Sequence, residues 1–68
     1  MQYKYEVLSE SEIFNEIMSL PVTTISQLKA GGFIETFMNF RKSEDYGLVS
    51  MSVVRIDGHN QYHFVWSL

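Results

Sequence analysis

The two ends of the chain alternate between apolar and polar residues, whereas the middle follows helical spacing. At the start, Tyr3, Tyr5 and Val7 alternate with polar neighbours over residues 2–8. Such a period of two is typical of a half-buried strand, because successive side chains point to opposite faces of a sheet. We therefore expect the chain to open with a strand that joins a sheet, although its neighbour cannot be read from the sequence.

The last twenty residues predict a β-hairpin. Two β-rich runs, Leu48–Ile56 and Gln61–Leu68, are separated by Asp57-Gly58-His59-Asn60. Asp-Gly between such runs favours a type I′ turn, because glycine accepts the positive φ that this turn requires. A two-residue turn and a four-residue turn give different partners but the same faces, since the register moves by an even number.

One face of this hairpin is expected to be buried and the other largely wet. With a two-residue turn, the predicted pairs on the buried face are Val53–Tyr62, Met51–Phe64 and Val49–Trp66. The wet face carries Ser50, Ser52, His63 and Ser67, with Val54 and Val65 among them.

The first helix is expected over residues 10–19. Ser9 and Glu12 fit the capping box that opens a helix, and Pro21 stops it. Apolar residues then recur at helical spacing and give the helix one apolar face, namely Ile13, Phe14, Ile17 and Met18.

Two further helical segments follow. Thr24 and Gln27 fit a second capping box before a brief turn or helix over Ile25–Ala30, which Gly31-Gly32 would end in a left-handed conformation. A helix is also expected from Phe33 to about Lys42. Its apolar side carries Phe33, Ile34, Phe37, Met38 and Phe40, and its polar side carries Glu35, Thr36 and Asn39.

These elements predict one α+β domain over residues 1–68, in the order β-α-(α)-β-β. The sheet is small and mainly antiparallel, with the helices packed on one face. A second domain would have no core of its own at this length. The chain has no cysteine, so neither a disulfide nor a thiolate metal site can stabilise it.

Charge and composition narrow the class of protein. The chain carries five basic and eight acidic residues, for a net charge of −3, whereas a nucleic-acid binder presents a basic stripe. The acids gather near the start, and we interpret Glu6, Glu10, Glu12 and Glu16 as a solvated helix face. No basic leader is evident and no stretch approaches the about 20 apolar residues of a membrane span, so we expect a cytoplasmic protein.

No residue group predicts catalysis or a metal site. His59, His63 and Asp57 lack the close spacing of helical metal ligands. Ser52 is predicted to lie opposite His63, but a serine on a flat sheet has neither oxyanion donors nor a nucleophile elbow. We therefore expect no enzyme activity, no metal and no cofactor.

Arg41 falls inside the apolar arc of the third predicted helix, where a solvated charge is not expected. One interpretation is that its side chain extends into water from the last turn, where the helix dipole favours a cation. The other is a contact surface for an acidic partner or a phosphate. The predicted partner-binding residues are Arg41, Lys42, Tyr46, Phe40 and Trp66.

Part of the sequence resembles a family of very short uncharacterised bacterial and phage proteins. The shared features are a Tyr-rich opening strand, a helix, a Gly-Trp-Glu-Leu-Val-Ser-like strand start and an aromatic final strand. The corresponding segments here are Tyr3-Lys4-Tyr5-Glu6-Val7, Asp45-Tyr46-Gly47-Leu48-Val49-Ser50-Met51 and Tyr62-His63-Phe64-Val65-Trp66. Asp45 replaces the usual glycine, Tyr46 the tryptophan and Gly47 the acid, and residues 20–34 have no counterpart. The resemblance implies a fold but no activity, because the family has none established. The small size and the irregular middle of the chain separately suggest a phage or mobile-element product.

The leading hypothesis is a small non-enzymatic regulatory or inhibitory protein that binds another macromolecule as a homodimer, such as a phage product that targets a host or defence protein. One tryptophan, four tyrosines, five phenylalanines and four methionines exceed what one sheet face and two helices can hide. The final strand, which ends at Leu68, is a candidate edge for pairing with a second copy. The alternative is a binder of a nucleotide or anionic metabolite, with an arginine-lined pocket formed by Arg41, Arg55, Lys42 and either Tyr46 or Trp66.

Overall fold

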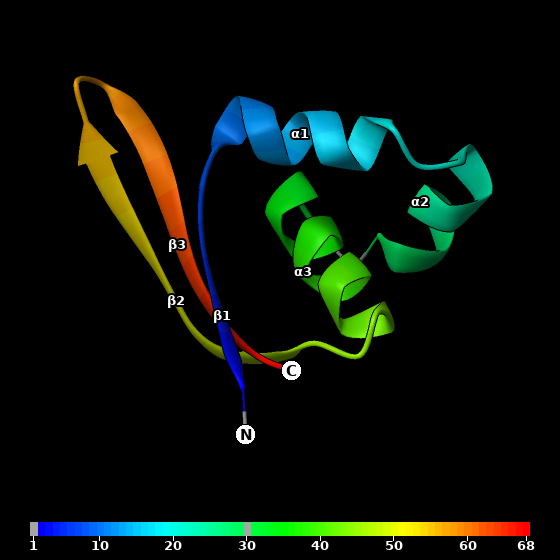
Figure 1. Cartoon of the computed structure of the whole chain (residues 1–68). Coiled ribbons are helices and arrows are strands. Elements are labelled where there is room, and N and C mark those ends of the chain that lie inside the picture. The colour runs from blue at the N-terminus through cyan, green and yellow to red at the C-terminus, as the bar shows by residue number, and fades with distance from the viewer. Residues whose placement is uncertain (1, 30) are drawn as a thin grey trace.

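The structure is a computed structural model that describes residues 2–29 and 31–68. Three helices and three strands follow one another along the chain (Figure 1). They are β1 (Tyr3–Ser9), α1 (Glu10–Met18), α2 (Val22–Leu28), α3 (Phe33–Ser43), β2 (Gly47–Ile56) and β3 (His59–Ser67). The predicted α+β class and element order are confirmed.

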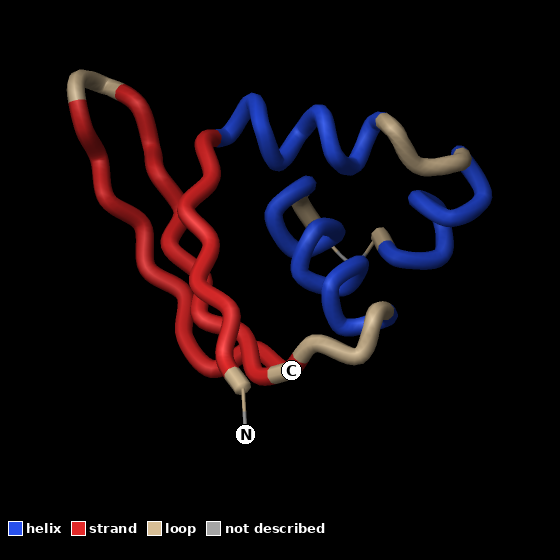
Figure 2. Tube along the Cα trace, viewed as in Figure 1, coloured by secondary structure: helices blue, strands red, loops and turns tan. Residues whose placement is uncertain are grey.

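The three strands form one antiparallel sheet in the order β1-β3-β2 (Figure 2). The first strand pairs with the last, from Tyr3 opposite Ser67 to Ser9 opposite Gln61. The final strand is therefore central, and the expectation that it offers an edge is wrong. The edges of the sheet are β1 and β2.

The hairpin closes through the predicted two-residue turn. Asp57 and Gly58 both have positive φ, 50° and 79°, as a type I′ turn requires, and Ile56 pairs with His59. The pairs Val53–Tyr62 and Met51–Phe64 are confirmed. The pair Val49–Trp66 is wrong, because the register shifts between Leu48 and Ser50 and brings Leu48 opposite Trp66. A bulge of this kind adds one residue to an edge strand and bends it.

The predicted capping box opens α1. The backbone N–H of Glu12 donates to Ser9 Oγ over 3.2 Å, and the backbone N–H of Ser9 donates to Glu12 Oε1 over 3.0 Å. The backbone hydrogen bond from Ser9, followed by its side-chain bond, lowers the pKa of Glu12 below the ordinary value of 4.5. The helix ends at Met18, before Pro21.

The middle of the chain differs from the prediction. Helix α2 begins at Val22, directly after Pro21, and has no side-chain cap, so the proposed box of Thr24 and Gln27 is wrong. The expected end of that helix at Ala30 lies outside the described residues. Gly32 has a φ of −77°, and instead of closing a helix it caps the start of α3, where its N–H donates to Glu35.

All three helices lie on one side of the sheet (Figure 1). Helices α1 and α3 pack against the strands and against each other, whereas α2 packs against α3. The buried apolar core comprises Ile13, Ile17, Phe37, Tyr62, Phe64 and Trp66. Thr36, expected on the wet side of α3, is also buried. Within the described residues, no helix is both long enough and apolar enough to cross a membrane.

Strand β1 has the opposite orientation from the one its pattern favours. Glu6 lies opposite Phe64, on the face that the helices cover, together with Lys4 and Leu8. Tyr3, Tyr5 and Val7 therefore lie on the uncovered face, and each is exposed. The alternation correctly predicted a strand, but the apolar half of that strand is turned away from the core.

Candidate interaction surface

The uncovered side of the sheet, here called the outer face, carries no Asp, Glu, Lys or Arg among the described residues. The register places on it Tyr3, Tyr5, Val7 and Ser9 from β1, Ser50, Ser52, Val54 and Ile56 from β2, and His59, Gln61, His63, Val65 and Ser67 from β3. The charged side chains of the strands, Lys4, Glu6 and Arg55, are all on the opposite face. A chain with thirteen charged residues (5 + 8) thus leaves one whole sheet face uncharged.

Large apolar side chains are exposed on the outer face. Tyr3 and Tyr5 are 60% and 63% exposed, and Val7, Val54 and Ile56 are also exposed. Single exposed apolar residues are common, but a group of them on one uncharged face is typical of an interaction site. Tyrosine is enriched in protein interfaces, whereas charged residues are depleted at interface centres. The outer face has both features.

A tyrosine–histidine pair joins β1 to β3 on this face. Tyr5 Oη lies 2.6 Å from Nδ1 of His63, and the ring centroids are 6.0 Å apart. Ser52 lies opposite His63 in the predicted register, but the polar contact of the histidine is with Tyr5. His63 Nε2 is buried and has no hydrogen-bond partner within the part of the chain that the structure describes. The pair holds the Tyr5 ring across the sheet.

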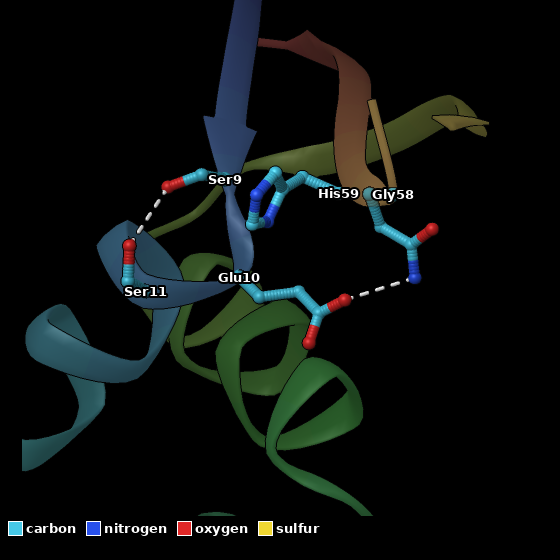
Figure 3. Close-up of a pocket in the computed structure, with 6 residues that line it drawn as sticks. Ser9, Glu10, Ser11, Gly58 and His59 are labelled. Carbon is cyan, nitrogen blue, oxygen red and sulfur yellow. Dashed lines mark hydrogen bonds between the residues drawn. The ribbon is translucent and has the colours of Figure 1, made fainter. Parts of the chain in front are cut away.

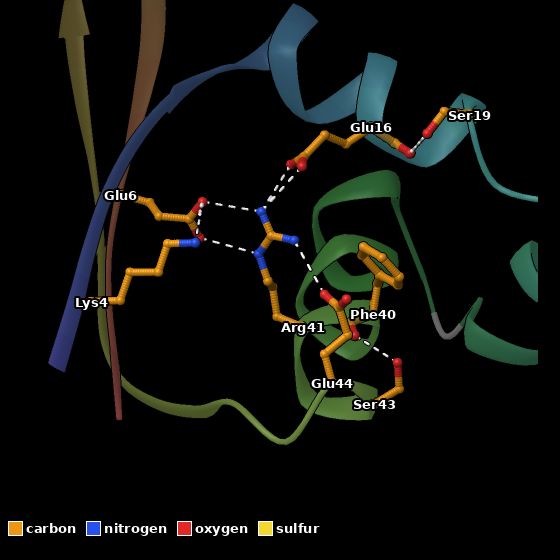
Figure 4. Close-up of polar contacts among 8 residues, drawn as sticks. All are labelled: Lys4, Glu6, Glu16, Ser19, Phe40, Arg41, Ser43 and Glu44. Atoms are coloured by element: carbon orange, nitrogen blue, oxygen red, sulfur yellow. Dashed lines mark hydrogen bonds and ion pairs between the residues drawn. The ribbon is translucent and has the colours of Figure 1, made fainter. Parts of the chain in front are cut away.

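Arg41, the first of the predicted partner-binding residues, is buried and binds carboxylates of its own chain (Figure 4). It is 8% exposed, so the interpretation that it extends into water is wrong. Its Nε and one terminal nitrogen donate to the two carboxylate oxygens of Glu6 over 3.1 and 3.0 Å. The same terminal nitrogen lies 3.1 Å from Glu16, and the other lies 3.4 Å from Glu44. We call these four residues the Arg41 cluster.

The Arg41 cluster joins three elements, because Glu6 is in β1, Glu16 in α1, and Arg41 with Glu44 at the end of α3. Burial acts to lower the pKa of Arg41, but the hydrogen bonds and charge of Glu6, and then those of Glu16, outweigh it and raise the pKa. The guanidinium also lies over the Phe37 ring, 4.7 Å from its centroid. The expectation of a solvated helix face is therefore wrong for Glu6, which lies in β1 with its side chain 11% exposed, whereas the Glu16 side chain on α1 is 40% exposed.

None of the other predicted partner-binding residues lies on the outer face. Trp66 is fully buried and contacts Phe37, Phe64 and Tyr46. Tyr46 and Phe40 are half-buried beside Arg41, and Lys42 is exposed at the end of α3. Their role in partner binding stays a prediction, which the burial of Trp66 and Arg41 does not favour.

A pocket of about 430 Å³ lies between the start of α1 and the hairpin turn (Figure 3). It is lined by Ser9, Glu10, Ser11, Gly58, His59 and Asn60, and the Asn60 amide donates to Glu10 over 2.9 Å. The ligand-binding hypothesis requires an arginine-lined pocket, but this lining contains an acid and no arginine. The described residues also contain no group of three or more candidate metal ligands.

The comparisons with known proteins do not assign the chain to a family. No protein-family model, no curated protein and no solved structure matches the chain. The resemblance to very short bacterial and phage proteins therefore stays a prediction, as does a phage origin. The function must therefore be inferred from the surface itself.

The sequence alone did not identify the outer face as a candidate site. Tyr3, Tyr5 and Val7 are the residues it missed, because their alternation was interpreted as burial. One signal was available in the sequence. A strand that turns Glu6 toward the helices requires a buried cation near Glu6, and Arg41 lies within the apolar arc of its helix, where it supplies that cation.

Proposed function

We propose that this chain is a non-enzymatic regulatory or inhibitory protein that binds another protein through the outer face of its sheet. The observation that carries the proposal is an exposed sheet face that combines tyrosines and aliphatic residues with no formal charge. A partner surface of apolar groups and uncharged hydrogen-bonding groups would match it, since the tyrosine and serine hydroxyls can donate and accept.

The chemistry of the face favours a protein over other classes of partner. Nucleic acids and anionic membrane surfaces are bound through lysine and arginine, and the described outer face carries neither. A small ligand is usually enclosed by a concave site, whereas this site is the side of a three-stranded sheet. Protein interfaces tolerate a broad surface and concentrate binding energy in a few aromatic residues.

The double variant Tyr3→Thr/Tyr5→Thr tests this role. Threonine keeps the β propensity of the strand but removes two exposed aromatic rings. Since each interface tyrosine contributes on the order of 1–2 kcal/mol, we expect affinity for the partner to fall by at least about tenfold. The measurement is quantitative affinity capture from the cells that make the protein, followed by titration of the captured protein.

The matched control is Met18→Gln, which changes an exposed apolar residue on α1, away from the outer face. The proposal predicts one protein that wild type and control retain and that the double variant loses. Circular dichroism checks that the double variant folds. Equal retention by all three proteins would exclude the outer face as the binding surface.

A further inference from the structure

Strand β2 is an edge strand whose protection is limited to the bulge near its start and one charged side chain near its end. All its residues except Gly47 are exposed, and it contains neither proline nor an acid. Its one charged residue, Arg55, lies near the turn, where its guanidinium donates to Asn60 over 3.2 Å. Edge strands are usually protected by charged side chains, proline or bulges. The other edge, β1, carries Lys4 and Glu6 and continues directly into α1.

The face of β2 that points toward the helices is also poorly covered. Met51 and Val53 lie on that face, opposite Phe64 and Tyr62, and yet both are exposed, Val53 by 49%. The partner residues on β3 are buried, so the helices cover the central strand more fully than they cover Met51 and Val53. Space therefore remains beside the helices for a second strand to continue the sheet.

We propose that β2 pairs antiparallel with β2 of a second copy to form a six-stranded sheet across a two-fold axis. The axis is perpendicular to the sheet, because that symmetry makes neighbouring copies of one strand antiparallel and keeps each face on its own side. Both helix layers then lie on one side, and the two outer faces form one continuous surface. The inference does not rest on the binding role proposed above, because it uses the edge of the sheet and not its outer face.

The bulge sets the register of this pairing. It interrupts the regular edge between Leu48 and Ser50, so the regular segment runs from Ser50 to Ile56 and its middle residue is Val53. Full pairing of this segment with its copy places Val53 opposite Val53, and Met51 opposite Arg55. No like charges face each other, and the exposed Met51 and Val53 side chains become covered.

A cysteine at position 53 tests the pairing, since the natural chain has none. Opposite residues in an antiparallel pair have Cα atoms about 4.5 or 5.5 Å apart, within disulfide range. Val53→Cys should therefore form a disulfide dimer as the main species under mild oxidation. The matched control is Ser52→Cys, whose copies are diagonal neighbours about 7–8 Å apart and should crosslink several-fold less.

The solution mass of the reduced proteins completes the test. We expect the wild type to be a dimer by light scattering, and Val53→Lys to dissociate at least about tenfold more readily because two lysines would meet at the axis. Val22→Lys, on exposed α2, should keep the wild-type mass. A wild-type monomer at every concentration would overturn the proposal, as would a dimer in which Ser52→Cys crosslinks as well as Val53→Cys. If Tyr3→Thr/Tyr5→Thr lost partner capture while remaining a dimer, that result would support the proposed binding face and leave the β2 pairing unaffected.

Discussion

Replacing Arg41 by alanine should destabilise the fold by about 3–5 kcal/mol, because it removes the closest cation from the buried Glu6 carboxylate and leaves only the more exposed Lys4, 3.9 Å away. The Glu6 side chain is only 11% exposed and its closest cation is Arg41, at 3.0 Å. A loss of this size is comparable to the whole stability of a domain this small. The measurement is urea unfolding followed by tryptophan fluorescence, since Trp66 lies in the core.

Two further variants distinguish the effect of the buried charge on stability from the effect of changing any cation at the end of α3. Lys42→Ala changes the neighbouring exposed cation and should alter the free energy of unfolding by less than about 0.5 kcal/mol. The double variant Arg41→Met/Glu6→Leu removes both charges at similar volume and should recover most of the stability, because apolar pairs often replace buried ion pairs well. A loss under about 1 kcal/mol for the single Arg41→Ala variant would contradict this account and show that solvent or Lys4 compensates the Glu6 charge.

Phe37→Ala should be similarly damaging, with an expected loss of about 3–5 kcal/mol from lost apolar contact and the cavity left behind. Phe37 is fully buried, and its ring lies 5.3 Å from Phe64 and 6.4 Å from Trp66, measured between centroids. It also packs beneath the Arg41 guanidinium. We therefore expect thermal unfolding near or below room temperature, measured by circular dichroism.

Phe14→Ala is the matched control, because Phe14 is a phenylalanine on α1 that is half exposed and contacts Phe33 edge-on. Less of its surface leaves water on folding, so its truncation should cost clearly less than that of Phe37. Equal losses for the two variants would mean that the core is not centred between α3 and β3.

Local sequence rules predicted much of the fold. Asp57-Gly58 predicted the turn, since both residues must adopt positive φ there. The two-residue length of this turn then predicted most of the hairpin pairs. Ser9 and Glu12 predicted the start of α1, because a capping box satisfies backbone groups within four residues. These features depend on residues close together in the chain.

The failures come from contacts between distant residues. An alternating strand does not say which half faces the core, and the orientation of β1 is fixed by Glu6 meeting Arg41, thirty-five positions later. The extra residue of the bulge is Val49, which is neither glycine nor proline, so the sequence did not predict the register shift and the predicted partner of Trp66 was wrong. The candidate surface was missed for the first of these reasons, since burying Glu6 is what turns Tyr5 outward.

The proposed function depends on the tyrosines of β1 lying on an open, uncharged face of the sheet. A soluble paramagnetic probe tests it directly, because the probe broadens the NMR signals of side chains that solvent reaches. The Tyr3 and Tyr5 rings should broaden strongly in the isolated protein, whereas the Tyr62 ring, 9% exposed, should not. Protection of Tyr3 and Tyr5 at the level of Tyr62 would contradict the orientation of β1 and, with it, the proposed binding surface.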